Sequence, residues 1–161
     1  MNNGPLLSLG SNGPNVRRLQ RLLVEMKLLD YTGIDGSFSA DTEQGVESFQ
    51  SGNGLFPDGV VGPLTWAALP ADPETLYLEL GHMGPIVGSL QQALLTYGGT
   101  GSPTDPGPID GKFGVLTRAA VKAYQGDRGV TVDGIAGDRT WWVPAGGAGA
   151  TLASLAGLTT V

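Results

Sequence analysis

The chain has 161 residues, among them 27 glycines and 11 prolines, with no cysteine and a formal net charge of −6. The length suits one ordinary domain or two small ones, and the glycine and proline content predicts short elements joined by many turns. The lack of cysteine excludes disulfides, thiolate metal sites and a thiol nucleophile. The acidic charge argues against a nucleic-acid surface, which needs an excess of Lys and Arg. No stretch approaches the ~20 apolar residues that cross a membrane, so membrane insertion is not expected.

The first five residues, Met1–Pro5, contain neither a positive segment nor a long apolar one. No secretory signal is therefore expected in this sequence. The chain is expected to be a mature or recombinant form, or to reach its site of action without such a signal.

An internal repeat divides the chain. Leu9–Pro14 recurs as Leu80–Pro85 at an offset of 71 residues, and Gly33–Trp66 aligns without gaps on Pro108–Trp141, with 13 of 34 positions identical. Chance does not produce that agreement in an ungapped run. The extra residues of the second copy fall within 98–108, whose composition predicts a longer loop. Each copy has about 70 residues, near the lower limit for an independent core.

Three helices are predicted in the first copy. Apolar residues at spacings of three to four predict a helix beginning near Pro14, because a proline there removes no needed backbone donor. Its buried stripe is Val16, Leu19, Leu22, Leu23 and Met26. A second helix begins near Ser39, a suitable N-cap, and buries Val46 and Phe49. A Gly-rich turn follows, and residues 62–66 open a short third helix.

The second copy repeats this order. Its first stripe, after Pro85, consists of Val87, Leu90, Ala93, Leu94 and Tyr97. Val121 and Tyr124 correspond to the apolar pair of the second helix, and residues 137–141 open the third.

These elements predict an all-α fold of two tandem three-helix bundles, residues 6–69 and 77–144. The two prolines and the acidic residues of positions 70–74 predict a short, stiff Pro-rich linker between them. Residues 145–161 form a Gly/Ala-rich tail that begins like a flexible linker. The tail then carries Leu152, Leu155 and Leu158, which suit a short helix or an extended segment that docks on the modules or on a partner.

The motifs of each copy follow a recognisable order. A Leu-Gln helix precedes an Asp-Gly-x-Phe turn, a Thr-led helix ending in an aromatic-Gln pair, a Gly-x-x-x-Asp-Gly turn and a Gly-x-x-Thr-Trp finish. This order resembles the bacterial peptidoglycan-binding-like domain, a three-helix module found beside cell-wall hydrolases and transpeptidases. The resemblance covers residues 6–69 and 77–144. Ser39, Pro57 and Tyr124 depart from the family pattern, which leaves the fold intact but gives no ground to expect equal ligand affinity in the two copies.

The candidate ligand-binding residues recur between the copies or stand near element ends: Tyr31, Asp35, Phe38, Gln50, Asp110, Phe113, Gln125 and Trp142. Each aspartate precedes a glycine, where it either meets a ligand or bonds backbone donors of its own turn. The two glutamine amides bond either a sugar or peptide group or the turn that follows. Trp66 and Trp141 are predicted core anchors. Trp142 points elsewhere on the helix, and is predicted to be an exposed stacking platform.

No catalytic site, metal site or cofactor is predicted. His82 is the lone histidine, with no second His or Cys to share a metal and no nucleophile motif nearby. The aspartates lie in recurring turns rather than in apolar pockets suited to a general acid. The resemblance itself implies a binding module, because the enzymes of that family carry their chemistry on another domain.

The resemblance thus implies non-catalytic binding of peptidoglycan at the envelope, by a protein of bacterial or phage origin. Two linked copies would gain by effective concentration. The alternative is a structural or adaptor subunit of a phage tail-like or contractile injection particle, attached to a particle or envelope protein through residues 145–161. A protein–protein module without wall affinity is a third interpretation, since a fold does not fix its ligand.

Overall fold

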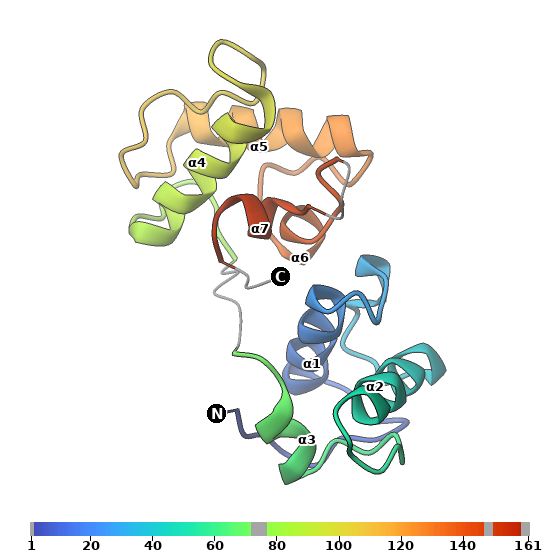
Figure 1. Cartoon of the computed structure of the whole chain (residues 1–161). Helices are drawn as coiled ribbons and strands as arrows, with labels where there is room; N and C mark the ends of the chain where they lie inside the picture. Colours follow the sequence, from blue (N-terminus) through green and yellow to red (C-terminus); the bar gives the residue numbers. More distant parts are fainter. Residues whose placement is uncertain (1, 72–76, 147–149, 159–161) are drawn as a thin grey trace. The chain divides into compact units, whose positions relative to one another are not determined.

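The computed structural model describes residues 2–71, 77–146 and 150–158. The chain divides into two compact units, residues 1–73 and 74–161. The regular structure of the described residues is helical, and extended segments pair only through isolated bridges. Figure 1 shows the helices of each unit. The all-α prediction is confirmed, and most of the predicted Pro-rich linker lies outside the described residues.

Four short elements form the first unit: α1 (Pro14–Glu25), the 3-10 turn η1 (Tyr31–Gly33), α2 (Ala40–Gly52) and α3 (Pro63–Ala68). Pro14 and Pro63 occupy the first turns of α1 and α3, where no backbone donor is lost. Ser39 holds the N-cap position of α2, but its side chain makes no capping hydrogen bond. The predicted helices are therefore present.

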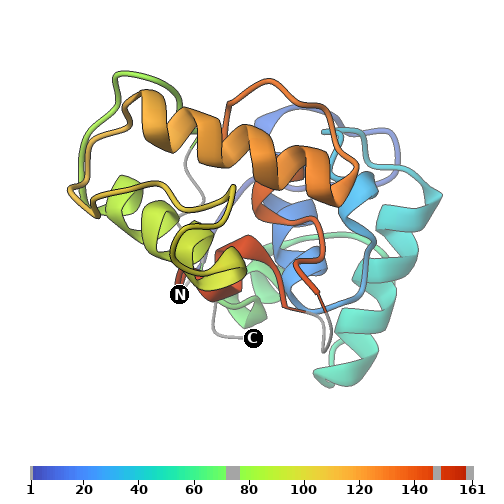
Figure 2. The ribbon, with the colours of Figure 1, turned by 90° about the horizontal axis from the view of Figure 1, so that it is seen from above.

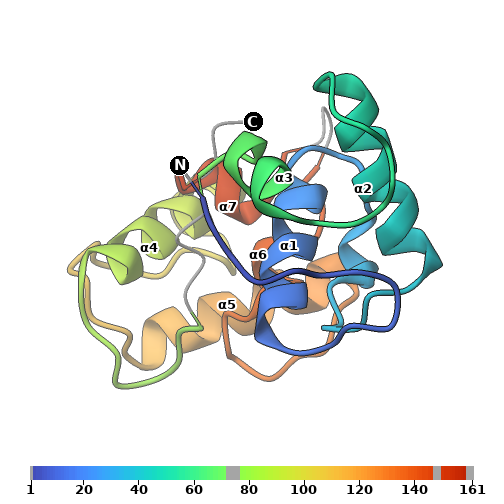
Figure 3. The ribbon, with the colours of Figure 1, turned by 90° about the horizontal axis from the view of Figure 1, so that it is seen from below.

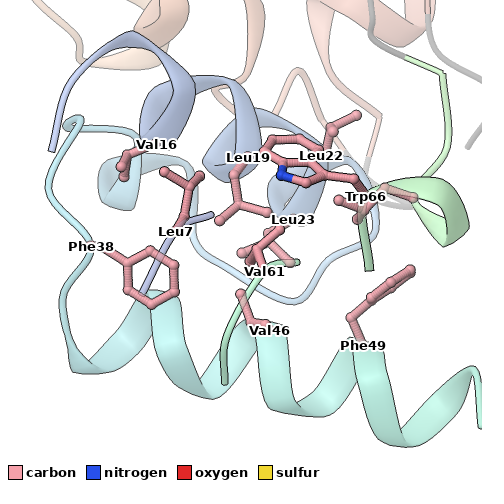
Figure 4. Packing of buried hydrophobic residues seen from close by; sticks show 11 residues of the cluster. Leu7, Val16, Leu19, Leu22, Leu23, Phe38, Val46, Phe49, Val61 and Trp66 are labelled. Atoms are coloured by element: carbon pink, nitrogen blue, oxygen red, sulfur yellow. The ribbon is translucent and has the colours of Figure 1, made fainter. Parts of the chain in front are cut away.

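The core of the first unit lies between α1 and α2 and is closed by α3. In Figure 4, Leu19 and Leu23 of α1 point toward Val46 of α2, and Trp66 of α3 lies beside them. These four side chains are fully buried. Trp66 is thus a core anchor, as predicted, and its Nε1 donates to the carbonyl oxygen of Pro5 at 2.8 Å.

The second unit repeats this frame with α4 (Pro85–Gly98), α5 (Val115–Arg128) and α6 (Asp138–Trp141). Val87, Leu90, Ala93 and Leu94 of the predicted stripe are buried, and Trp141 is fully enclosed. Tyr97, the last residue of that stripe, is partly exposed. The longer loop between α4 and α5 can be followed in Figure 2. Asp105 orders this loop by accepting from the backbone N–H groups of Gly101 and Gly107, at 2.7 and 2.9 Å. Those bonds lower the pKa of the Asp105 carboxyl.

The C-terminal tail folds back onto the second unit. Its helix α7 (Leu152–Leu155) packs on α4 and α6, and Figure 3 shows it beside α4. Leu152 and Ala153 are fully buried. A reciprocal pair of hydrogen bonds between Thr151 and Ser154 caps the helix. Of the two docking modes that the sequence left open, the structure shows docking on the module. Residues 147–149 of the predicted flexible segment lie outside the described part.

The prediction that Trp142 is an exposed stacking platform is wrong. The exposed fraction of Trp142 is 2%, so it is a core residue and not an exposed platform. The equivalent position in the first unit, Ala67, is partly exposed. The difference arises because the chain after Trp142 turns back through the Pro144–Thr151 bridge and places α7 against α6. The prediction was wrong because it treated the module as ending at residue 144.

Candidate ligand-binding surface

A buried glutamine organises the first half of the first unit. Oε1 of Gln20 accepts from the backbone N–H groups of Asp35 and Gly36, at 3.0 and 2.8 Å. Its Nε2 donates to Oδ1 of Asp35, the carbonyl oxygen of Ser37 and Oγ1 of Thr42, at 3.0, 3.0 and 3.1 Å. One side chain on α1 therefore fixes both the Asp-Gly turn and the start of α2.

The second half of the same unit is built in the same way. Nε2 of Gln50 donates to Oδ1 of Asp58, the carbonyl oxygen of Val60 and Oγ1 of Thr65, at 3.0, 2.9 and 3.1 Å. Its Oε1 accepts from the N–H group of Gly59 at 3.0 Å. Gln50 thus ties α2 to the second Asp-Gly turn and to the start of α3.

Both arrangements recur in the second unit, around Gln91 and Gln125. Each amide again donates to an aspartate, a backbone carbonyl and a threonine hydroxyl, and accepts from two N–H groups of an Asp-Gly turn. The aspartate and threonine are seven residues apart in all four cases: Asp35/Thr42, Asp58/Thr65, Asp110/Thr117 and Asp133/Thr140. Each module therefore consists of two related halves. The Asp–Thr spacing of seven residues, which occurs four times, is visible in the sequence but was not recognised when the chain was divided into only two repeats.

The structure sorts the candidate residues into interior and surface. The interior holds Phe38, Gln50, Phe113, Gln125 and Trp142. Every described hydrogen bond of the two glutamine amides goes to its own module, which favours the structural interpretation over ligand contact. Asp35 and Asp110 are exposed, and Tyr31 on η1 is partly exposed.

The two exposed aspartates are held ionised by their turns. The N–H group of Ser37, at 2.9 Å, and the amide of Gln20 hold the pKa of the Asp35 carboxyl below its ordinary value, and the positive charge of Arg17 acts in the same direction. The N–H group of Lys112 and the amide of Gln91 do the same for the pKa of Asp110. Both groups therefore present a negative charge at neutral pH.

A shallow depression lies at the same place in each unit, where the first helix begins beside the first Asp-Gly turn. The first depression is lined by Asn12, Gly13, Pro14, Arg17, Arg21, Asp35, Gly36 and Ser37. The second depression is lined by Met83, Gly84, Pro85, Gly88, Asp110, Gly111 and Lys112. Gly36 and Gly111 adopt φ angles of 78° and 72°, a conformation that favours glycine. Their lack of side chains keeps the floor of each depression open.

The sequence interpretation missed most of these lining residues. The two exposed aspartates were found because they recur, whereas Arg17, Arg21, Met83 and Lys112 differ between the copies. Arg17 corresponds to Gly88, and Asn12 corresponds to Met83. Only the folded chain shows that these variable positions border a shared depression.

A second hollow in the first unit is apolar. It is lined in part by Leu6, Leu55, Phe56, Pro63 and Leu64, and Phe56 is 81% exposed. The second unit has Tyr77, Val130, Thr131, Asp138 and Arg139 at these positions. The two units therefore share a frame but present different surfaces around it.

Within residues 2–71, 77–146 and 150–158, no group of three or more His, Cys, Asp or Glu side chains is arranged to hold a metal ion. Over the same residues, no helix has both the length and the apolar character needed to cross a membrane.

Comparison with protein families identifies the modules. The family described as "Putative peptidoglycan binding domain" matches twice, at residues 12–69 and 83–142. The chain belongs to this peptidoglycan-binding family. Both matches contain the Asp-Gly turns and the glutamines described above, so the family pattern coincides with the buried polar frame.

Several curated relatives of this chain are named as N-acetylmuramoyl-L-alanine amidases. An N-acetylmuramoyl-L-alanine amidase, CwlM of Mycobacterium tuberculosis, is 31% identical over 153 residues, which cover 85% of this chain and 36% of that protein. A probable N-acetylmuramoyl-L-alanine amidase of Bacillus licheniformis is 33% identical over 156 residues, covering 85% of this chain and 44% of that protein. The chain thus spans less than half the length of these relatives.

Two solved structures are similar to parts of the chain. A peptidoglycan-binding protein from Clostridioides difficile is 36% identical, with a TM-score of 0.37 and 39% of each chain covered. The endolysin of the Burkholderia AP3 phage is 33% identical, with a TM-score of 0.38, covering 58% of this chain and 32% of that one.

Proposed function

We propose that this chain binds peptidoglycan without cleaving it, through the paired depressions at the starts of α1 and α4. The observation that carries the proposal is the recurrence of one depression at one place in both units, on a frame shared with a peptidoglycan-binding family. Gln20 and Gln91 preorganise the two floors, since each fixes the Asp-Gly turn that forms one of them.

The chemistry of the surface suits a glycan with a peptide stem. Asp35 and Asp110 are exposed acceptors for hydroxyl and amide donors. Phe56 and Tyr77, with exposed fractions of 81% and 59%, are exposed aromatic side chains, which pack well on sugar rings. These two residues lie outside both depressions and take the place of Trp142 as additional candidate stacking surfaces. The relatives that cleave the wall extend well beyond the matched region, and we place any catalytic chemistry outside this chain.

The particle-subunit alternative placed the apolar residues of the tail on a partner. Of the three leucines, Leu152 is buried in the second unit, whereas Leu155 and Leu158 are partly exposed, so the tail gives this alternative little support. Among the described residues, the tail therefore acts as part of a module. A protein that binds the cell wall would act at the cell envelope.

The test is co-sedimentation of the full chain with purified sacculi. The chain should sediment with them, and Ser37→Trp with Gly88→Trp should abolish sedimentation by filling both depressions. Ser51→Trp with Ala119→Trp adds the same bulk to exposed positions of α2 and α5 outside the depressions, and should bind like the unaltered chain. Equal binding by both pairs of variants would place the ligand elsewhere. Release of soluble wall fragments that follows the protein through purification would contradict the non-catalytic proposal.

A further inference from the structure

The helices α2 and α5 occupy equivalent places in the two units but carry opposite charges. The charged residues of α2 are three acids, which give the helix a charge of −3: Asp41, Glu43 and Glu47. Those of α5 are three cations and one acid, which give a charge of +2: Arg118, Lys122, Arg128 and Asp127. The buried positions of the two helices match one for one, so the inversion of charge belongs to their outer surfaces.

In the first unit, two glutamates of α2 lie over the second Asp-Gly turn. A Cβ atom built on Gly59 would lie 2.8 Å from Cγ of Glu43 and 3.2 Å from Oε1 of Glu47. Both glutamates are partly exposed, and Asp58 of the same turn is exposed. We call this surface, with its three carboxylates, the acidic face: Glu43, Glu47, Asp58 and Gly59.

In the second unit, two cations of α5 take the same place. A Cβ atom built on Gly134 would lie 2.9 Å from Cγ of Arg118 and 3.2 Å from Cε of Lys122. Arg118 is exposed and Lys122 is partly exposed. Asp133 of the turn contributes one negative charge, so two cations and one carboxylate leave an excess of one positive charge. We call this surface the basic face: Arg118, Lys122, Asp133 and Gly134.

The stability of α2 and α5 does not account for these pairs of like charges. Glu43 and Glu47 are four residues apart, as are Arg118 and Lys122, and like charges at that spacing destabilise a helix. Arg118 is the fourth residue of α5, near the positive end of the helix dipole, where a cation is unfavourable. Within the described part of the chain, none of the four side chains forms an ion pair or a hydrogen bond. Each face therefore gains from a partner of opposite charge.

We propose that copies of this chain associate with one another, with the acidic face of one copy against the basic face of the next. The inference goes beyond wall binding, because both faces lie outside the two depressions. Complementary charges favour this pairing, and like charges oppose the pairing of two identical faces. Every copy has one face of each sign, so the contact needs no second protein. Exposed ion pairs are weak, and the association is therefore expected at high local concentration, as between chains gathered on one surface.

The first test is sedimentation of the full chain over a range of protein concentrations at low salt. The unaltered chain should self-associate, and added salt should weaken the association because exposed charges are screened. Glu43→Gln with Glu47→Gln should weaken it at least about tenfold. Asp41→Asn with Ser48→Lys makes the same change in net charge on the opposite flank of α2, and should associate like the unaltered chain. An unaltered chain that remains monomeric at about 1 mM would overturn the inference.

The second test reverses one face at a time. Glu43→Lys with Glu47→Lys makes both faces of the chain positive, and Arg118→Glu with Lys122→Glu makes both negative. Each variant by itself should be monomeric, whereas an equimolar mixture should associate, because every positive face then finds a negative one. A mixture that stays as monomeric as its two components would contradict the proposed pairing. The mixture also controls for net charge, since its average charge equals that of the unaltered chain.

Folding and wall binding are measured on the same variants. Lys and Glu keep the aliphatic carbons that lie over Gly59 and Gly134, so denaturation curves should change little. If a reversed variant fails to fold, the Gln variants, which only neutralise charge, decide the question. An anionic polymer of the wall is the other occupant that the basic face could take. In that case Arg118→Gln with Lys122→Gln would weaken sedimentation with sacculi while leaving self-association unchanged, and that result would overturn the inference.

Discussion

At the scale of single residues, the repeated motif serves mainly to stabilise the fold. Gln20, Gln50, Gln91 and Gln125 are buried, and each joins a helix to an Asp-Gly turn and to the next helix. A buried amide is costly unless its donors and acceptors are all bonded. The recurrence of these residues therefore follows from the demands of a small core, and we propose that the residues around them bind the ligand.

Replacement of one such glutamine tests this view. Gln20→Leu should destabilise the first unit by about 3 kcal/mol, because the buried N–H group of Gly36 and the partly buried N–H group of Asp35 lose their acceptor. Gln44→Leu, at an exposed position of α2, should change the free energy of unfolding by less than about 0.5 kcal/mol. Chemical denaturation of both variants gives the comparison, and a small effect at Gln20 would show that the polar frame is dispensable.

The aspartates of the turns make stability depend on acid pH. The pKa values of Asp35 and Asp110 are lowered in the folded chain, below the ordinary value of 3.8. Their contribution to stability is thus complete above that value and is lost as pH falls through the lower folded-state values. The melting temperature should fall as pH is lowered from about 5 to about 2. Asp35→Asn with Asp110→Asn keeps the acceptor oxygen and should flatten this dependence; an unchanged pH profile would count against it.

At the scale of elements, the tail changes what the second module is. α7 is too short to persist alone, since isolated helices of this length are unstable in water. It is held by the burial of Leu152 and Ala153 against α4 and α6 and by the Thr151–Ser154 cap. Because α7 belongs to the module, removal of residues 145–161 is expected to destabilise the second unit rather than to free a tether.

A point substitution measures this contribution without shortening the chain. Leu152→Ala should cost the second unit about 2–5 kcal/mol, as deletion of buried methyl groups does elsewhere. Val115→Ala, at a position 72% exposed on α5, should have little effect. Hydrogen exchange resolved by residue would report lower protection in α4 and α5 and unchanged protection in α1 and α2. Protection that stays unchanged throughout would mean that α7 only rests on the surface.

At the scale of the whole molecule, duplication is the main functional feature. Each depression is shallow, so one site by itself is expected to bind weakly. Two linked sites on a polymer with many repeats raise the local concentration of the second site once the first is occupied. The curated amidases align over 85% of this chain, which includes both modules together.

Filling the depressions one at a time tests the value of the pair. Ser37→Trp alone and Gly88→Trp alone should each weaken binding to sacculi about a hundredfold or more. In each variant, the site that is not filled should bind short soluble wall fragments as tightly as it does in the unaltered chain. The reason is that a short fragment engages one site in either protein. Sacculus affinity that falls only by half in each single variant would show that the sites act independently.

The sequence by itself determined the architecture, because helical periodicity, prolines at helix starts and glycines in turns are local requirements that any copy must meet. It also determined the family, because the buried Gln–Asp–Thr frame constrains the same positions in every module. Tertiary structure alone decided which residues form the surface. Trp142 is enclosed by a tail that lies outside the repeat, and Arg17 lines the same depression as Asp35 only after α1 packs beside its turn. Such contacts join residues far apart in sequence, and no periodic pattern records them.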